Sequence, residues 1–326
     1  MKRKKFLIVY PSYSSKRDIE TKALALRLTN LGYQVEAFGI PCEGGWWTFQ
    51  KLDEKYKSRS GDILNSYAQL LNKLDGFDIM IADGGSMLHP DFVDQLQTYN
   101  IFICADDPES SEVLSKPVAS SFDYCFVANI ACLDLYRAWG CRKVSWLHLP
   151  VPANIIDRNI SEKTIRQPRE IDISMCSERV YGVSDRANRL EILKLQFPQV
   201  RLYGRGWPDG FISDRELFKL YKNTKIGWNL HNSIGPVNSR LMTLPAFGVM
   251  QICDCREKLG EIFKLNEEVV GFNSLAECID LTNYYLNNEK ERQDIAFKGW
   301  LRVLNDYTEE KWFNKLINLI EEDFNY

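Results

Sequence analysis

The sequence predicts an α/β protein with two Rossmann-like, doubly wound domains, each a parallel sheet covered by helices. Two observations predict this fold. The chain has 326 residues, about twice a typical domain length, so two separate cores are expected. Short apolar runs also alternate with segments of helical periodicity along most of the chain, which is typical of parallel sheets wound with helices.

Composition and charge exclude several classes of protein. The chain is 45% hydrophobic, 26% charged and 12% aromatic, as in ordinary globular proteins, so long disordered segments are not expected. The net charge of −3 gives no general attraction to nucleic acid, although residues 1–5 and 219–225 are locally basic. The first apolar run, residues 6–10, is too short for a signal-peptide core or a membrane span. We therefore expect a cytoplasmic protein.

The nine cysteines are scattered through apolar segments and form no CxxC pair. This pattern predicts reduced, mostly buried thiols rather than a disulfide framework or a zinc site. Cys253 and Cys255 could share one face of a strand, but the sequence places no second cysteine pair and no histidine beside them. We therefore expect no metal site and no cofactor.

The first half of the chain carries six apolar runs, and three segments between them have helical periodicity. We expect strands at residues 5–10, 34–40, 78–83, 100–105, 124–128 and 144–149. We expect helices at residues 18–31, 62–74 and 130–139, the first of them ending at Gly32.

A domain boundary is predicted after residue 152. Pro150 and Pro152 cannot continue a strand ladder, and a polar stretch follows them as far as Glu170. Beyond it, strands are expected at residues 171–176, 200–204, 225–230, 249–253 and 268–272, and helices at 184–197, 214–221, 237–247, 275–286 and 290–304. The predicted domains are residues 1–152 and 153–308. Residues 309–326 form a last helix with one apolar face, which we expect to pack on the first domain.

The loop after the predicted strand 225–230 is the most informative segment for function. It contains Asn229 and His231, and a helix should begin near Asn238 or Ser239, both good N-cap residues. Free amides and the positive end of the helix dipole favour an anion there, and Arg240 adds a charged donor suited to a diphosphate. The alternative is an ordinary loop with a capped helix and a solvated arginine.

Several segments resemble a known family. Residues 229–263 and 266–296 resemble the C-terminal half of the glycosyltransferase family that includes the spore maturation protein CgeB, a group 1 type of transferase. Residues 202–208, 106–109 and 146–150 are also similar to family segments. The resemblance implies the GT-B fold, in which two domains face a central cleft and the last helix crosses back to the first domain.

The resemblance also implies an activity. It implies transfer of a sugar, a hexose or a pentose, from a nucleotide-sugar donor bound on residues 179–268, without a metal. The acceptor, the stereochemistry and the oligomeric state do not follow from the sequence; a protein, a glycan, a small molecule or a modified DNA base are all open as acceptor.

The resemblance places further residues near the donor. The turn Gly204-Arg205-Gly206-Trp207 could bring the indole ring to the nucleobase, although core packing of Trp207 is equally compatible with the sequence. Arg179 could reach a donor phosphate, or it could be an exposed structural arginine.

One position departs from the family. Thr243 stands where the family has a glutamate that holds the donor's ribose, and a hydroxyl is a weaker, neutral partner. This departure keeps open an inactive sugar-nucleotide or glycan-binding protein. A sugar-nucleotide epimerase is a further alternative with the same architecture.

The catalytic candidates lie in the first domain, after its strands. Asp106 and Asp107 follow the predicted strand 100–105, and one of them could point into the cleft as a base for the acceptor hydroxyl. Adjacent carboxylates raise each other's pKa, although Asp107 could equally be a turn residue before Pro108. His89 and Asp83 are the second candidates. We expect His148 to be a core histidine, because it lies in an apolar strand.

Overall fold

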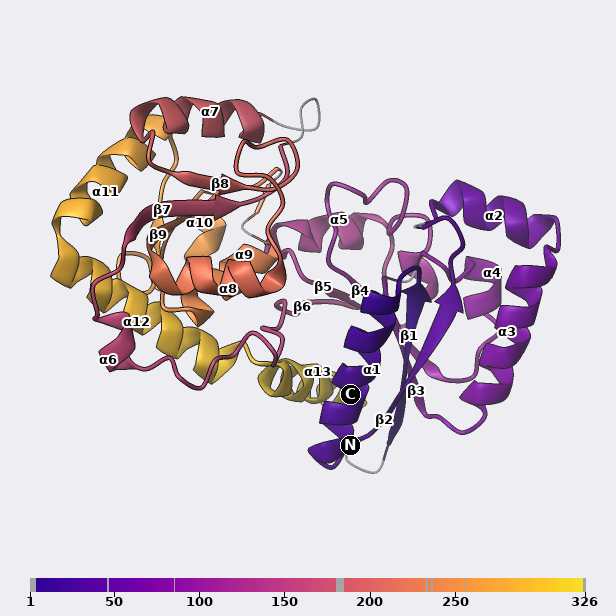
Figure 1. Cartoon of the computed structure of the whole chain (residues 1–326). Helices are drawn as coiled ribbons and strands as arrows, with labels where there is room; N and C mark the ends of the chain where they lie inside the picture. Colours follow the sequence, from indigo (N-terminus) through magenta and orange to yellow (C-terminus); the bar gives the residue numbers. More distant parts are fainter. Residues whose placement is uncertain are drawn as a thin grey trace. The chain divides into compact units, whose positions relative to one another are not determined.

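The computed structural model describes residues 4–45, 47–84, 86–179, 185–232, 234–235, 237–254 and 256–324. The chain separates into two compact units (Figure 1). The first unit contains the residues up to His148 together with those from Asn314 onward, and the second is Leu149–Phe313. Val151 belongs to the second unit, where its N–H donates to the Tyr307 carbonyl at 2.8 Å. The observed boundary therefore lies slightly before residue 152.

The first unit is built on six parallel strands in the order β2-β1-β3-β4-β5-β6. The strands are β1 (Lys5–Ser12), β2 (Gln34–Pro41), β3 (Ile79–Asp83), β4 (Tyr99–Cys104), β5 (Tyr124–Val127) and β6 (Val144–Trp146). Its helices are α1 (Ser15–Asn30), α2 (Phe49–Lys57), α3 (Gly61–Leu74), α4 (Pro90–Val93) and α5 (Leu133–Ala138), with short 3₁₀ turns at Ala119–Ser121 and Ile130–Cys132. Six consecutive residues of β1 are buried, because helices cover both faces of a parallel sheet.

The second unit has five parallel strands in the order β11-β10-β9-β7-β8. They are β7 (Ile171–Cys176), β8 (Arg201–Tyr203), β9 (Thr224–Asn229), β10 (Met250–Cys253) and β11 (Val270–Gly271). The helices are α6 (Glu162–Ile165), α7 (Arg186–Gln196), α8 (Asp214–Asn223), α9 (Ser239–Ala246), α10 (Arg256–Leu259), α11 (Leu275–Asn287) and α12 (Glu289–Asp306). Because β8 and β9 lie on opposite sides of β7, the strand order reverses there, and a ligand crevice is expected at the carboxyl ends of these strands. The predicted two-domain parallel α/β fold is confirmed.

Side-chain caps fix where several helices begin. The Asn238 side chain accepts from the Leu241 N–H and starts α9, as the sequence predicts. Ser213 and Glu216 form a capping box at α8, and Ser274 accepts from the Glu277 N–H at α11. These bonds satisfy amides that have no partner within their own helix. The predicted start of α7 at residue 184 lies outside the described residues, and α7 is described from Arg186.

The last helix, α13 (Glu309–Phe324), joins the first unit from Asn314 onward. There the Tyr33 hydroxyl donates to Asn314, and the Tyr99 hydroxyl donates to Asp323 at 2.6 Å. Leu316 and Ile320 are fully buried. Polar anchors and an apolar face together attach the end of the chain to this unit.

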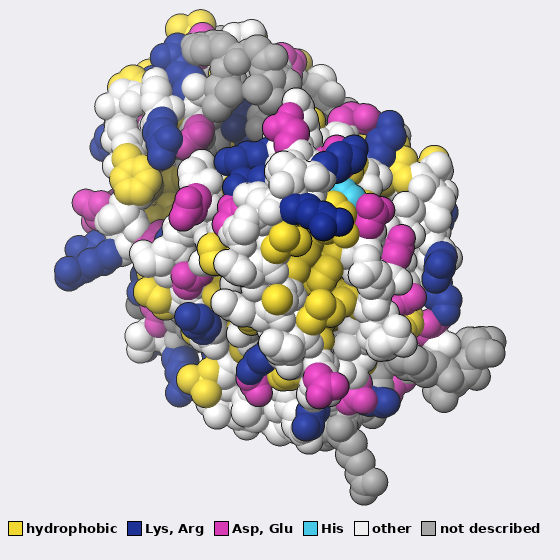
Figure 2. Space-filling model, turned by 90° about the vertical axis from the view of Figure 1, so that its right-hand side faces the viewer, with side chains coloured by type: hydrophobic (Ala, Val, Ile, Leu, Met, Phe, Trp, Pro, Cys, Tyr) yellow, Lys and Arg dark blue, Asp and Glu magenta, His cyan; other side chains and the backbone are white. Residues whose placement is uncertain are grey.

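Helix α3 of the first unit is amphipathic, with one buried face and one exposed face. Its inner residues Ile63, Tyr67 and Leu70 are buried, whereas Leu64 and Leu71 are partly exposed. Figure 2 views the molecule from the side of α2, α3 and α4 and shows hydrophobic side chains near the middle of that face, with Lys and Arg beside them.

None of the helices described is both long and apolar enough to cross a membrane. None of the eight described cysteines forms a disulfide, and Cys255 lies outside the described residues.

Candidate functional site

The loop after β9 is held by a chain of side-chain amides. The Asn238 amide donates to Asn229 Oδ1 at 2.8 Å, and the Asn229 amide donates to Gln251 Oε1 at 2.7 Å. Asn229 and Gln251 are buried, so these bonds fix the start of α9 to β9 and β10. Gln251 is not among the residues predicted from the sequence, although a polar residue inside the apolar strand MQIC is a signal for a partner of this kind.

Arg240 lies at the carboxyl ends of β7 and β9. Its Nε donates to Asn229 Oδ1 at 3.1 Å, its Nη1 to the Cys176 carbonyl at 2.9 Å and its Nη2 to the Leu230 carbonyl at 3.2 Å. Burial lowers the pKa of this guanidinium. Within the described part of the chain, no ion pair joins Arg240 to a carboxylate. Three of its five N–H groups serve these bonds, so two remain for a ligand.

Two neighbouring residues of α9, Ser239 and Thr243, offer fewer hydrogen-bonding groups to a ligand than Arg240 does. Ser239 is exposed, and its carbonyl accepts from Thr243 Oγ1 at 2.7 Å. The Thr243 side chain is buried and uses its proton within its own helix. Thr243 can therefore accept a hydrogen bond from a ligand but offers it no donor.

The turn after β8 packs its tryptophan inward. Trp207 is only 6% exposed, and its indole Nε1 donates to the Ser177 carbonyl at 3.0 Å. The Arg179 guanidinium lies 5.1 Å from the centre of the ring. Gly204 has φ +131, and a Cβ there would lie 2.2 Å from the Ser177 carbonyl oxygen, so the turn requires glycine. Trp207 therefore follows the core-packing alternative and does not present its ring to a base.

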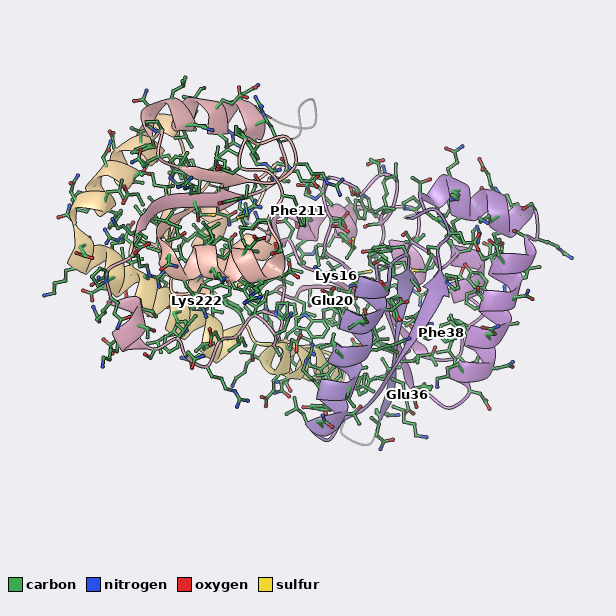
Figure 3. The ribbon with its side chains drawn as sticks, in the orientation of Figure 1. Lys16, Glu20, Glu36, Phe38, Phe211 and Lys222 are labelled. Atoms are coloured by element: carbon green, nitrogen blue, oxygen red, sulfur yellow. The ribbon has the colours of Figure 1, made fainter. Side chains whose placement is uncertain are left out.

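The two arginines of this region are already engaged. Arg179 pairs with Glu191 and donates to the Gly206 carbonyl at 3.3 Å, whereas Arg205 is exposed and lies 3.5 Å from Glu178. An exposed aromatic side chain follows on the same loop. Phe211, labelled in Figure 3, lies between β8 and α8 and is 80% exposed. Phe211 could not be predicted as an exposed residue, because only the tertiary fold shows which aromatic side chains stay exposed.

His231 forms a buried dyad with a residue that the sequence analysis missed. Its Nδ1 lies 2.5 Å from Asp254 Oδ1, and its main-chain N–H donates to Asp254 Oδ2 at 3.0 Å. Arg189 donates to Asp254 Oδ2 at 3.1 Å and to the His231 carbonyl at 2.9 Å. Burial lowers the pKa of His231, and the charges of Arg240 and Arg186 lower it further against the opposing effect of Asp254.

The carboxylate of the dyad is ionised. Burial alone would raise the pKa of Asp254, but the hydrogen bonds from His231 and the charge of Arg189 outweigh burial and hold it below its usual value. His231 Nε2 is buried, and no group in the described part of the chain forms a hydrogen bond with it. A cavity of about 440 Å³ opens beside it, lined by Asp185, Arg189, His231, Asn232, Asp254, Phe272, Asn273, Ser274 and Leu275.

Cys253 brings a third potential ligand to this dyad. Ligand atoms of His231, Cys253 and Asp254 lie within 4.8 Å of one another, although the sequence shows no histidine near Cys253. The surrounding charge does not suit a cation, because Arg189 already binds Asp254 and Arg186 and Arg240 lower the pKa of His231. We therefore assign no metal to this cluster.

In the first unit, the two adjacent aspartates have different environments. Asp107 is buried, and its carboxylate accepts from Ser115 Oγ at 3.0 Å and Tyr136 Oη at 2.5 Å. Burial raises the pKa of Asp107 against the effect of these bonds. Asp106 is exposed at the end of β4, and partial desolvation, with the charges of Asp107 and Asp83, raises its pKa. Of the pair, only Asp106 is open to a reactant.

Asp83 and His89, the other two catalytic candidates, are each held by neighbouring side chains. Asp83 pairs with Arg17 at 2.5 Å at the end of β3. His89 is buried, caps α4 through Nδ1, and stacks on Tyr56 with ring centres 4.0 Å apart. Its Nε2 lies 3.2 Å from Asp53. His148 is buried, as the sequence predicts. Neither histidine is available as a base in this arrangement.

Comparisons with known proteins show which family model and which solved structures this chain resembles. Residues 185–318 match a family model described as glycosyl transferase-like. HepE from Anabaena, in complex with UDP and glucose, superposes with a TM-score of 0.66 at 12% identity, covering 98% of this chain and all of that one. No curated protein sequence matches significantly.

Two further solved structures extend this similarity. Sucrose-phosphate synthase from Thermosynechococcus elongatus gives a TM-score of 0.67 at 11% identity, covering 99% of this chain and 100% of the other. A glycosyltransferase from Rickettsia africae gives 0.62 at 13% identity, with 98% of each chain covered. The chain therefore has the GT-B fold, and its residues 185–318 are similar to the glycosyl transferase-like family.

Proposed function

We propose that this protein is a glycosyltransferase that binds a nucleotide-sugar donor at the carboxyl ends of β7 and β9 and transfers the sugar to an acceptor. The observation that carries the proposal is Arg240, a half-buried arginine at the start of α9 with no carboxylate partner among the described residues. A diphosphate supplies the missing negative charge, and the first-turn amides of α9 add donors. The UDP and glucose bound to HepE support a donor of this class.

The proposal includes a catalytic role for Asp106. Its exposed carboxylate would accept the acceptor's proton, while Asp107 stays engaged with Ser115 and Tyr136. Arg240 and the helix amides would stabilise the leaving diphosphate without a metal, and the donor is a substrate rather than a cofactor. Membership of the CgeB-like subfamily, transfer of a hexose or pentose and a cytoplasmic location stay predictions from the sequence.

Thr243 favours one alternative. Its hydroxyl donates within α9 and cannot replace the two acceptor oxygens of a carboxylate. A protein that binds the nucleotide-sugar without transferring it is therefore the second candidate. Turnover of a panel of UDP-, GDP- and ADP-sugars separates the two: an enzyme releases the nucleotide, whereas the alternative only binds.

The binding experiment compares each nucleoside diphosphate with its nucleoside by calorimetry. Arg240→Gln should weaken the binding free energy of the diphosphate by about 1.5 to 3 kcal/mol, because a charged hydrogen bond is lost. The binding free energy of the nucleoside should change little. Arg201→Gln is the matched control, since Arg201 is an exposed arginine at the amino end of β8. Equal losses for diphosphate and nucleoside, or no binding of any diphosphate to the wild-type protein, would contradict the proposal.

A further inference from the structure

The cavity beside His231 lies within the second unit. Its lining comes from the carboxyl ends of β9, β10 and β11 and from the first turns of α7 and α11. His231 is 4% exposed, and its Nε2 has no hydrogen-bond partner among the described residues. An unpaired buried polar atom is costly, so it indicates a partner supplied from outside the fold.

The partners of Asp254 determine which kind of partner Nε2 requires. Asp254 Oδ1 lies 2.5 Å from His231 Nδ1, and Oδ2 accepts from the His231 N–H and from Arg189. An ionised carboxylate is acceptor-only, so Nδ1 must carry the ring proton. Burial and the nearby arginines keep the second proton off the ring by lowering the pKa of His231. Nε2 is therefore an acceptor and requires an O–H or N–H donor.

This tautomer excludes the ligands that the nearby charges would otherwise suggest. Phosphate oxygens that carry no proton cannot donate to Nε2, and the Arg189 guanidinium is already bound to Asp185 at 3.0 Å and to Asp254. A metal ion is disfavoured by the same arginine. A hydroxyl satisfies Nε2 without bringing a charge into the cavity.

The rest of the lining fits a ring with several hydroxyls. Asn273, Ser274 and Asp185 offer polar groups, while Phe272 and Leu275 offer apolar surface for the C–H face of such a ring. A volume of about 440 Å³ is within the usual range for small-molecule pockets.

We propose that this cavity binds a sugar ring and that His231 Nε2 accepts a hydrogen bond from one of its hydroxyls, with Asp254 fixing the imidazole. The identification of the hydroxylated ligand as a sugar rests on the proposed glycosyltransferase function. The sugar has two possible sources, the nucleotide donor itself or a separate saccharide, and the chemistry at Nε2 is the same for both.

Calorimetry with three sets of probes tests the proposal: the nucleoside diphosphates UDP and GDP, the corresponding nucleotide-sugars, and the free sugars. We expect His231→Phe to weaken sugar-dependent binding about tenfold or more and to leave binding of the bare diphosphate unchanged, because an unpaired polar group of the ligand is rejected strongly. Asn283→Ala, an exposed position on α11, is the matched control and should change neither. If His231→Phe removes the affinity that the nucleotide-sugar has beyond the bare diphosphate, the bound sugar belongs to the donor. If the variant instead removes binding of the free sugar, the bound sugar is a separate saccharide.

A second measurement needs no variant. Nitrogen NMR of the three histidines should show one with a protonated Nδ1 and a bare Nε2, and the Nε2 signal should shift when the sugar binds. If diphosphates bind but no sugar adds affinity or shifts that signal, the cavity proposal is wrong and the proposed function stands. If no diphosphate binds, the proposed function fails, while binding of a free sugar would still support the cavity. A protonated Nε2, or binding of inorganic phosphate that His231→Phe abolishes, would also overturn the cavity proposal.

Discussion

Arg240 differs from Arg189 and Arg179, two other arginines of the second unit, in the atoms that it contacts. Arg189 pairs with Asp254 and Asp185, and Arg179 pairs with Glu191. Arg240 contacts a side-chain amide oxygen and two carbonyl oxygens, which orient the guanidinium but do not neutralise it. A charge held in this way is available to an anion at the reversal point of the sheet.

The two adjacent aspartates should respond differently to the same substitution. Asp106→Asn should lower turnover about 10² to 10⁴-fold and leave stability unchanged, because it removes a proton acceptor from an exposed position. Asp107→Asn should lower the melting temperature. Its new NH₂ group would face the hydroxyl of Tyr136 or Ser115, which now donates to the carboxylate, so one buried hydrogen bond would be lost. Calorimetric melting and steady-state rates for both variants check this. Wild-type turnover in Asp106→Asn would exclude it as the base.

Burial of a neutral His231 predicts a loss of stability in mild acid. The folded pKa lies below the usual value of 6.5, so between these two values the unfolded chain binds more protons than the folded one. The free energy of unfolding should therefore fall as the pH drops below about 6.5. Asp254 should add a second loss at lower pH, because its own folded pKa is lowered.

Melting temperatures between pH 8 and pH 5 measure the effect of His231. The slope in this window should be smaller in His231→Phe than in the wild-type protein, because the variant has no imidazole to protonate at this position. The other two histidines are unchanged and contribute equally to both curves. Identical slopes would contradict a buried neutral His231.

At the scale of elements, two glycines in helices make a matched pair. A Cβ on Gly299 of α12 would lie 2.5 Å from the Glu268 carbonyl oxygen, whereas a Cβ on Gly61 of α3 would meet nothing within 4 Å. Gly299→Ala should destabilise the protein by about 1 to 3 kcal/mol, because α12 must shift away from the chain before β11. Gly61→Ala should be neutral or slightly stabilising. Urea unfolding of both variants checks the difference.

The strands could be predicted from the sequence because a parallel sheet covered on both faces requires continuous apolar runs. β1 and β10 are of this kind. α2, α4, α6 and α10 were missed because they are short, and three of them have only four residues, too few for periodicity to be visible. α2 is rich in charged residues, and most of its side chains stay exposed or half-buried.

The candidate site was predictable only where its residues are close in sequence. Asn229, Asn238 and Arg240 lie between the end of β9 and the first turn of α9, and their residue types alone indicate a capped helix near an anion. The His231–Asp254 dyad joins residues that follow two different strands, β9 and β10, so no local pattern shows it. The inward packing of Trp207 depends on the Ser177 carbonyl of another loop, and local sequence cannot distinguish it from an exposed ring.

At the scale of the whole molecule, each unit has its own core. In the first unit the core lies around β1, β3 and β4, and in the second it contains residues of β7, β9 and β10 with α7, α11 and α12. Each unit therefore has the apolar burial that an independent domain requires. The proposed donor and sugar sites lie entirely within the second unit, and Asp106 lies in the first.

The C-terminal helix completes the first unit, so its removal should destabilise that unit. Leu316 and Ile320 are fully buried, and Asp323 binds Tyr99 and Lys143. Deleting residues 309–326 should uncover this apolar surface, lower the melting temperature and promote aggregation. The point variant Leu316→Ala tests the same contact. It should lower the free energy of unfolding by about 2 to 5 kcal/mol, because truncating a buried side chain leaves a cavity. Asn318 is exposed on the same helix, so Asn318→Ala should change the free energy of unfolding little. If the truncated chain melts and stays in solution like the full one, α13 does not support the first unit.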